Sequence, residues 1–180
     1  MILAATSWVL RLITAAMLAL TAYVHADLAP VYDNNRDATL TQGDVFRIQA
    51  GLASFAALAV LVLAWRTLWS LLAWALAIVV AASALGAVLI YAHYDIGRLG
   101  PLPDMYEPLW YAEKRQAAFA AGIATGAAVI GFGLTAISAR RAVSPDGPGH
   151  RPDGRPGWLR RRTRPWARTP WPRRRAASRS

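Results

Sequence analysis

Two short elements of the chain carry residue types that bind metal ions. Segments 23–27 and 91–95 both read Tyr-x-His-x-Asp, lie 68 residues apart, and hold two of the three histidines in the chain. A neutral imidazole is the commonest side-chain metal ligand, and carboxylates complete zinc and copper sites. These residue types therefore predict a metal site with four candidate ligands: His25, His93, Asp27 and Asp95.

Two other interpretations of these elements are open. In one, the two histidines face each other across a haem as its axial ligands. In the other, Tyr and His only mark the level at which each helix leaves the lipid, because amphipathic side chains favour that level. Helix geometry favours the second interpretation, since Tyr and Asp four residues apart share a face while the His between them points away. We therefore expect no bound cofactor.

Sequence motifs give no reason to expect an enzyme. The chain has no cysteine, which excludes a cysteine nucleophile, a disulfide scaffold and an iron–sulfur cluster held by cysteines. It also lacks the HExxH, Gly-rich phosphate-loop and GxSxG patterns. The sequence therefore predicts a protein that is not an enzyme.

Charge and hydropathy are unevenly distributed along the chain. Of its 180 residues, 56% are hydrophobic and only 17% are charged, yet the formal net charge is +10. Residues 1–139 carry seven Lys/Arg and eight Asp/Glu, whereas residues 140–180 carry thirteen Arg and two Asp. The chain therefore divides into a nearly neutral apolar domain, 1–139, and a basic tail, 140–180.

Four apolar stretches of the first domain are long enough to cross a membrane. A bilayer core about 30 Å thick needs roughly 20 apolar residues as a helix. The four stretches are about 8–25, 48–65, 71–93 and 117–138. Each is apolar on all sides instead of striped, which is typical of a helix in lipid. The predicted fold class is all-α, a four-helix transmembrane bundle followed by a disordered basic tail.

The positions of the arginines predict how the bundle is oriented. Arg140 and Arg141 follow the last span, and arginine-rich segments next to spans stay in the cytoplasm. Alternation then gives a multi-pass plasma-membrane protein with both termini cytoplasmic and the acidic loops 26–47 and 94–116 outside. Spans one and three run in the same direction, so their matching elements predict a parallel repeat of two-helix units. An alternative is that residues 1–26 are a cleaved signal peptide.

Local signals predict where the spans begin. Asp44 is expected to cap the second span, and Pro108 to stand in the first turn of a helix that starts near Glu107. Between the third and fourth spans, the Gly- and Pro-rich residues 97–111 predict a chain that folds back on itself. We expect this loop to form a cap over the helix ends or an aromatic belt at the bilayer surface.

The span interiors contain few charges and several small residues. Arg11 lies near the cytoplasmic end of the first span, so we expect its side chain to extend to the membrane surface. The pairs Gly122/Gly126 and Ala82/Gly86 allow close helix approach. We expect them to pack helices within the bundle, with the face of a homodimer as the alternative.

The tail has the composition of a disordered segment that binds lipid. Residues 144–180 are rich in proline and arginine and contain few of the aliphatic residues that a folded domain needs for its core. Trp prefers the headgroup zone, and each Arg gains about 1 kcal/mol beside an anionic inner leaflet. The predicted lipid-binding residues are Trp158, Arg160, Arg161, Arg162, Arg164, Trp166, Arg168, Trp171, Arg173, Arg174 and Arg175. Nucleic acid is the less favoured partner, because the tail is tethered to a membrane.

The span layout carries a resemblance to known membrane proteins. It rests on the Tyr-x-His-x-Asp elements at the outer ends and on Gly-Pro-Leu-Pro-Asp-Met-Tyr-Glu-Pro before the last span. Over about residues 8–138, the chain resembles uncharacterised four-span integral membrane proteins of actinobacteria and is loosely DoxX-like in layout. The resemblance implies a four-helix fold in a membrane and implies no catalytic residue.

These observations predict a small integral membrane protein with an accessory or structural role in the cell envelope. Its expected partners are the lipid bilayer, anionic headgroups, and a second copy or another envelope protein. The alternative is a metal- or haem-binding accessory of redox chemistry or transport that uses His25 and His93. A carrier of small solutes is a third possibility, but the spans offer no polar site at the bilayer midplane.

Overall fold

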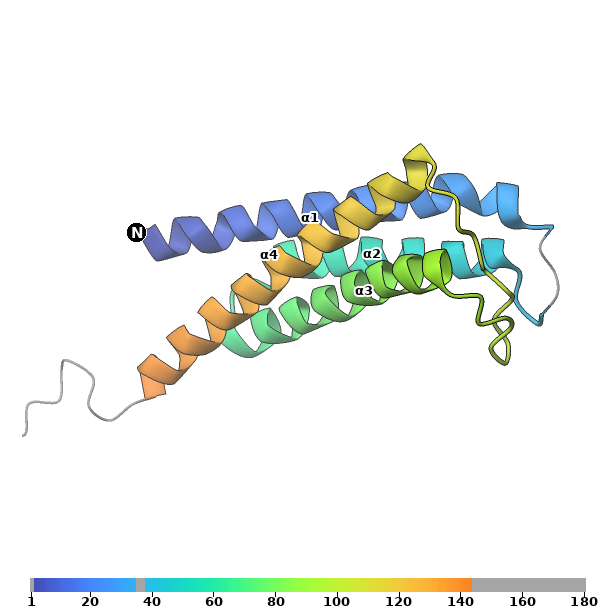
Figure 1. The fold of residues 1–180 in the computed structure, drawn as a ribbon. Helices are drawn as coiled ribbons and strands as arrows, with labels where there is room; N and C mark the ends of the chain where they lie inside the picture. The colour runs from blue at the N-terminus through green and yellow to red at the C-terminus, as the bar shows by residue number, and fades with distance from the viewer. Residues whose placement is uncertain (1, 35–37, 144–180) are drawn as a thin grey trace, which may run out of the picture. The chain divides into compact units, whose positions relative to one another are not determined.

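The computed structural model describes residues 2–34 and 38–143, and its elements there are all helical. Residues 1, 35–37 and 144–180, which include the predicted lipid-binding Trp and Arg residues, lie outside the described residues. The elements are α1 (Ile2–Leu28), the short 3-10 helix η1 (Ala29–Tyr32), α2 (Gln42–Val62), α3 (Thr67–His93) and α4 (Ala112–Val143) (Figure 1). The all-α prediction is confirmed for this part of the chain.

Four of these helices are long and apolar enough to cross a membrane. Their number matches the four predicted spans, but their ends do not. The predicted second and third spans leave residues 66–70 between them, but α2 stops at Val62 and α3 begins at Thr67, so the connection covers residues 63–66. The last helix continues through Arg140 and Arg141 to Val143, beyond the expected boundary at residue 139. Polar residues extend these helices past their apolar runs, because backbone hydrogen bonding does not stop where the lipid does.

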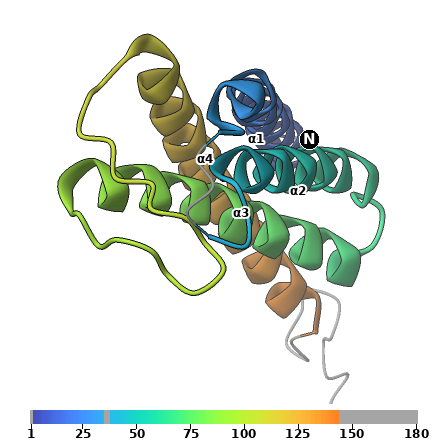
Figure 2. The same cartoon turned by 90° about the vertical axis from the view of Figure 1, so that its right-hand side faces the viewer.

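The helices pack in the order in which they follow one another along the chain. α1 packs against α2 and α4, and α3 packs against α4 and α2, whereas α1 and α3 hardly touch (Figures 1 and 2). The pairs α1–α2 and α3–α4 are closely packed, and α1 packs just as closely against α4, so the packing does not set the predicted two-helix units apart. This arrangement is an up-and-down four-helix bundle.

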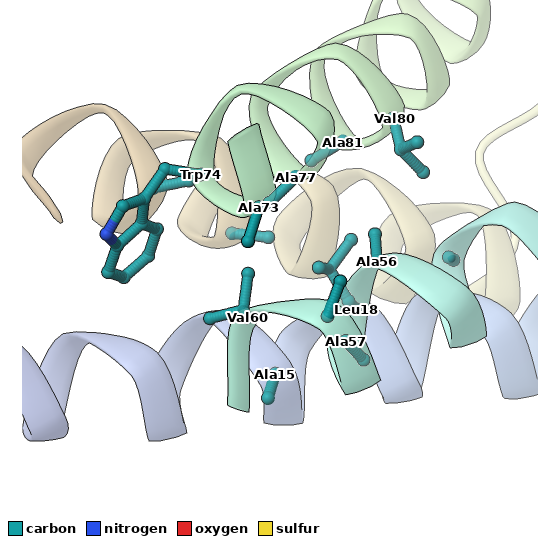
Figure 3. Close-up of a cluster of buried hydrophobic side chains, with 14 of the residues drawn as sticks. Ala15, Leu18, Ala56, Ala57, Val60, Ala73, Trp74, Ala77, Val80 and Ala81 are labelled. Atoms are coloured by element: carbon teal, nitrogen blue, oxygen red, sulfur yellow. The ribbon is translucent and has the colours of Figure 1, made fainter. Parts of the chain in front are cut away.

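Alanine forms most of the core of this bundle. Among the described residues, eleven of the fifteen members of the main buried cluster are alanine. The larger members are Leu18, Val60, Trp74 and Val80 (Figure 3). Large side chains such as Phe55 and Phe119 are exposed on the outside of the helices instead. Small residues inside and large apolar residues outside are typical of helices that pack against one another in lipid.

The close approach between helices occurs at a different glycine from those expected. A Cβ atom at Gly86, Gly122 or Gly126 meets no atom within 4 Å. The prediction that these glycines pack helices within the bundle is therefore wrong. At Gly131 in α4, by contrast, a Cβ atom would overlap the indole ring of Trp74 in α3.

The sequence predicts that the Arg11 side chain extends outward to the membrane surface, but in the structure it turns into the bundle. Only 4% of the residue is exposed. The guanidinium donates to the backbone oxygen of Val60 at 2.5 Å and to the hydroxyl of Ser70 at 2.5 Å. The short connection between α2 and α3 places these two acceptors beside α1. The Arg11 side chain therefore forms its hydrogen bonds inside the bundle.

The start of α2 is capped by Thr41 and not by Asp44. The Asp44 N–H donates to the Thr41 hydroxyl at 2.9 Å, and the Thr41 N–H donates to the Asp44 carboxylate at 3.0 Å. This reciprocal capping box places Asp44 at the third helical position. Arg47, one turn further, holds Asp33 at 2.6 Å and fixes the end of η1 beside α2.

The α3–α4 loop, residues 94–111, folds back on itself as expected. Positive φ angles at Gly97 and Gly100 turn the chain, and Leu99 and Leu102 exchange two backbone hydrogen bonds across the turn. No helix begins near Glu107, so the role predicted for Pro108 is wrong, and α4 starts at Ala112. The Glu107 N–H instead donates to the Tyr91 carbonyl at 3.0 Å, which fastens the loop to the end of α3.

Candidate functional site

The bundle contains a cavity of about 280 Å³ under the α3–α4 loop. All four long helices and the loop contribute side chains to its walls, which are mostly apolar. The polar side chains that line it include His25, Gln49, Ser83, Glu107, Tyr111 and Lys114. The loop is therefore a cap over the helix ends, with Met105 and Tyr111 turned to the cavity and Leu109 exposed.

His25 is the histidine that lines this cavity. It is 7% exposed, and its ring packs edge-on against Phe46 with 5.5 Å between the ring centroids. Its Nδ1 lies 2.7 Å from the backbone oxygen of Thr21. A carbonyl only accepts hydrogen bonds, so Nδ1 carries the proton and, in the neutral ring, Nε2 carries the lone pair. The imidazole therefore offers an acceptor nitrogen.

Lys114 brings a buried cation to the same cavity. It is 6% exposed, and its ammonium donates to the backbone oxygen of Glu107. The ammonium also lies 5.4 Å from the centroid of the Trp110 ring. A carbonyl and an aromatic face stabilise a cation, and the charge of Glu107, which lines the same cavity, stabilises it further. An ammonium has three N–H donors, so Lys114 has further capacity to bind an acceptor.

Tyr111 closes the cavity beside the first helix. Its hydroxyl lies 3.0 Å from the hydroxyl of Tyr32, which follows α1 in η1. Burial, together with this hydrogen bond, raises the pKa of Tyr111 well above its ordinary value. The phenol is therefore neutral at physiological pH and acts as a hydrogen-bonding group.

This pKa leads to a prediction about alkaline pH. Because the pKa is higher in the folded than in the unfolded protein, the associated stability is fully present below about pH 10 and is lost as pH rises further. We expect Tyr111→Phe to remove the last step of a spectroscopic tyrosinate titration and to weaken the alkaline loss of stability. Tyr32→Phe should shift that step to lower pH. An unchanged last step in Tyr111→Phe would assign it to another tyrosine.

The structure separates the four predicted metal ligands. His93 is exposed beside the Trp110 ring, with 6.4 Å between centroids, while His25 is buried against α2. Asp27 and Asp95 are both exposed. Within residues 2–34 and 38–143, no three His, Cys, Asp or Glu side chains are grouped so that they could hold a metal ion. His25 and His93 belong to α1 and α3, the two helices that hardly touch.

The repeated elements have the same local geometry and different surroundings. His93 Nδ1 lies 2.8 Å from the Leu89 carbonyl, one turn back, just as His25 binds Thr21. Tyr91, however, is buried at the cavity whereas Tyr23 is exposed. The residue types repeat, but the buried faces of the helices do not.

The site residues predicted from the sequence do not include Gln49, Tyr111 and Lys114, which line the cavity. Lys114 is unusual in the sequence, because it is the only lysine in the chain against nineteen arginines. Its role at the cavity depends on the loop that folds over Lys114, and no local sequence pattern predicts that contact.

The chain matches no protein-family model, no curated protein and no solved structure. The DoxX-like layout therefore stays a prediction from the sequence pattern.

Proposed function

We propose that this protein is an envelope accessory that binds a small amphipathic molecule between its four helices. The observation that carries the proposal is the capped cavity of about 280 Å³, where Lys114 and His25 meet mostly apolar walls. Ligand sites are typically apolar pockets with a few converging polar groups, and this volume lies near the lower end of their range. We infer a ligand with a short apolar body and a carboxylate or carbonyl head.

The same groups support binding and not catalysis as the role of the site. Lys114 donates, His25 Nε2 accepts, and Tyr111 stays protonated, so each group recognises a ligand atom without itself changing state. Arg66, Arg140 and Arg141 lie at the opposite end of the bundle, and the positive-inside rule then places the cavity on the outer side of the plasma membrane. Both termini are cytoplasmic in this proposal.

The test compares two alanines of α3 that differ in where they point. Ala84 lines the cavity, whereas Ala82 is exposed. We expect the purified full chain to retain a small molecule, detected by mass spectrometry of an organic extract. Ala84→Trp should lose that molecule, and Ala82→Trp should keep it, because only the first indole fills the cavity.

Decanoate serves as a defined probe in native mass spectrometry. We expect one decanoate per chain, with an affinity about tenfold lower in Lys114→Met, since a hydrogen bond to a charged group contributes about 1.5–3 kcal/mol. Equal retention in Ala84→Trp and Ala82→Trp, together with no effect of Lys114→Met on decanoate, would contradict the proposal.

A further inference from the structure

The opposite end of the bundle holds a second cavity of about 310 Å³. There, the first turns of α1 and the last turns of α4 extend past the α2–α3 connection (Figure 1). Its polar lining consists of one guanidinium and several hydroxyls, from Arg11, Ser7, Thr67, Ser70, Thr135 and Ser138. The described lining residues include no Asp or Glu. The cavity is therefore positively charged.

Arg11 supplies the charge and is more than nine-tenths buried. Its two hydrogen-bond acceptors, the Val60 carbonyl and the Ser70 hydroxyl, are neutral, and so is the Trp74 ring that lies 5.0 Å from Cζ. Withdrawing a cation from water is costly unless an anion compensates for it. The guanidinium has five N–H donors and uses two of them here, so it has donors left for an oxyanion.

The first turn of α3 adds a second, independent source of positive potential. The helix begins after Arg66, whose side chain makes no capping hydrogen bond, and its first turn contains no acidic residue. Its first N–H groups and the positive end of its dipole favour an anion. Thr67 and Ser70, from this same turn, line the cavity together with Arg11.

Three exposed tryptophans place this cavity at the level of lipid headgroups. Trp8, Trp65 and Trp69 surround the same end of the bundle, at the start of α1 and beside the α2–α3 connection. Tryptophan side chains collect at the boundary between lipid and water. The oxyanion nearest to this cavity is then the phosphate of a membrane phospholipid.

We infer that this cavity binds the phosphate group of one phospholipid, held by Arg11 and the first turn of α3. The guanidinium donates to the phosphate oxygens, and the backbone N–H groups of the helix start complete the site. Free phosphate has the same chemistry, so the test separates the two sources. The inference concerns the end of the bundle away from the amphiphile cavity and does not depend on that proposal.

Native mass spectrometry of the full chain in detergent tests the site with defined lipids. The probes are dioleoyl phosphatidylglycerol, dioleoylglycerol, which lacks the phosphate, and inorganic phosphate. High salt, about 0.5 M during equilibration, screens exposed arginines while affecting a buried one less. We expect one tightly bound phosphatidylglycerol per wild-type chain, no tight binding of dioleoylglycerol, and no displacement by millimolar phosphate.

Three variants distinguish binding of the lipid at this site from a general attraction of anionic lipid to basic residues. Arg11→Gln should weaken phosphatidylglycerol binding about tenfold, whereas Arg66→Gln removes the same charge from an exposed position and should change it less than about twofold. Thr67→Asp should also abolish tight binding, yet an acidic residue in the first turn favours the helix. We expect its thermal stability to be retained, and that result would show that the loss is not caused by misfolding.

Each contrary result has a clear meaning. Equal weakening by Arg11→Gln and Arg66→Gln, or tight binding that persists in Thr67→Asp, would overturn the site. Binding of dioleoylglycerol as tight as that of phosphatidylglycerol would show that phosphate is not recognised. Displacement of the lipid by inorganic phosphate would overturn the lipid as the specific ligand.

Discussion

Replacing Arg11 with alanine is expected to lower the free energy of unfolding by about 2–5 kcal/mol. The change removes two hydrogen bonds and leaves their acceptors, the Val60 carbonyl and the buried Ser70 hydroxyl, without this donor. The Val60 carbonyl belongs to the last turn of α2, where no further helical N–H reaches it. Arg11 therefore ties α1 to the end of α2 and the start of α3 at once.

The measurement is a denaturant titration of the detergent-solubilised protein, followed by circular dichroism. Arg66→Ala is the matched control, because Arg66 is exposed and its side chain makes no capping hydrogen bond. We expect this control to stay within about 0.5 kcal/mol of the wild type. Similar losses in the two variants would mean that net charge, and not the buried hydrogen bonds, determines the effect.

Arg11 also illustrates what the sequence predicts and what it does not. The sequence shows a charged residue near the end of an apolar run, and the side chain of such a residue usually extends to the membrane surface. The acceptors that hold it inside are 49 and 59 residues away in sequence. Nothing near Arg11 in the chain indicates that another helix ends beside it.

The number of long apolar helices was predictable because one physical requirement determines it. A helix needs roughly 20 apolar residues to cross the bilayer core, and four such runs are present. The ends depend on finer features, such as the capping box of Thr41 and Asp44. That box lies four to seven residues before residue 48, the predicted start of the span, in polar sequence that hydropathy does not assign to a helix.

The site was only partly predictable, for a related reason. His25 stood out because the chain has few histidines, and it does line the main cavity. Its expected partner His93 is exposed, since the repeat preserves residue types and not the buried face. The side chains that accompany His25 come from α2, α3, α4 and the loop, and only tertiary packing brings them together.

Replacing Gly131 with alanine is expected to lower the free energy of unfolding by about 1–3 kcal/mol, the cost of overpacking a core. A Cβ atom there would overlap three atoms of the Trp74 ring, Cε2, Cζ2 and Cη2. Trp74 is fully buried, and the Arg11 guanidinium lies 5.0 Å from its ring, so the indole has little room to move. Thermal or denaturant unfolding in detergent measures the loss.

Whether a Gly→Ala substitution destabilises or stabilises the protein distinguishes the effect of this contact from that of helix propensity. Gly133, two residues further along α4, has open space where its Cβ would be. Gly133→Ala should therefore stabilise the helix by up to about 1 kcal/mol, because alanine loses less backbone entropy than glycine. Trp74→Phe in the Gly131→Ala background should recover part of the loss, since a smaller ring relieves the overlap. If Gly131→Ala stabilises the protein as Gly133→Ala does, α3 and α4 do not approach each other closely at this point.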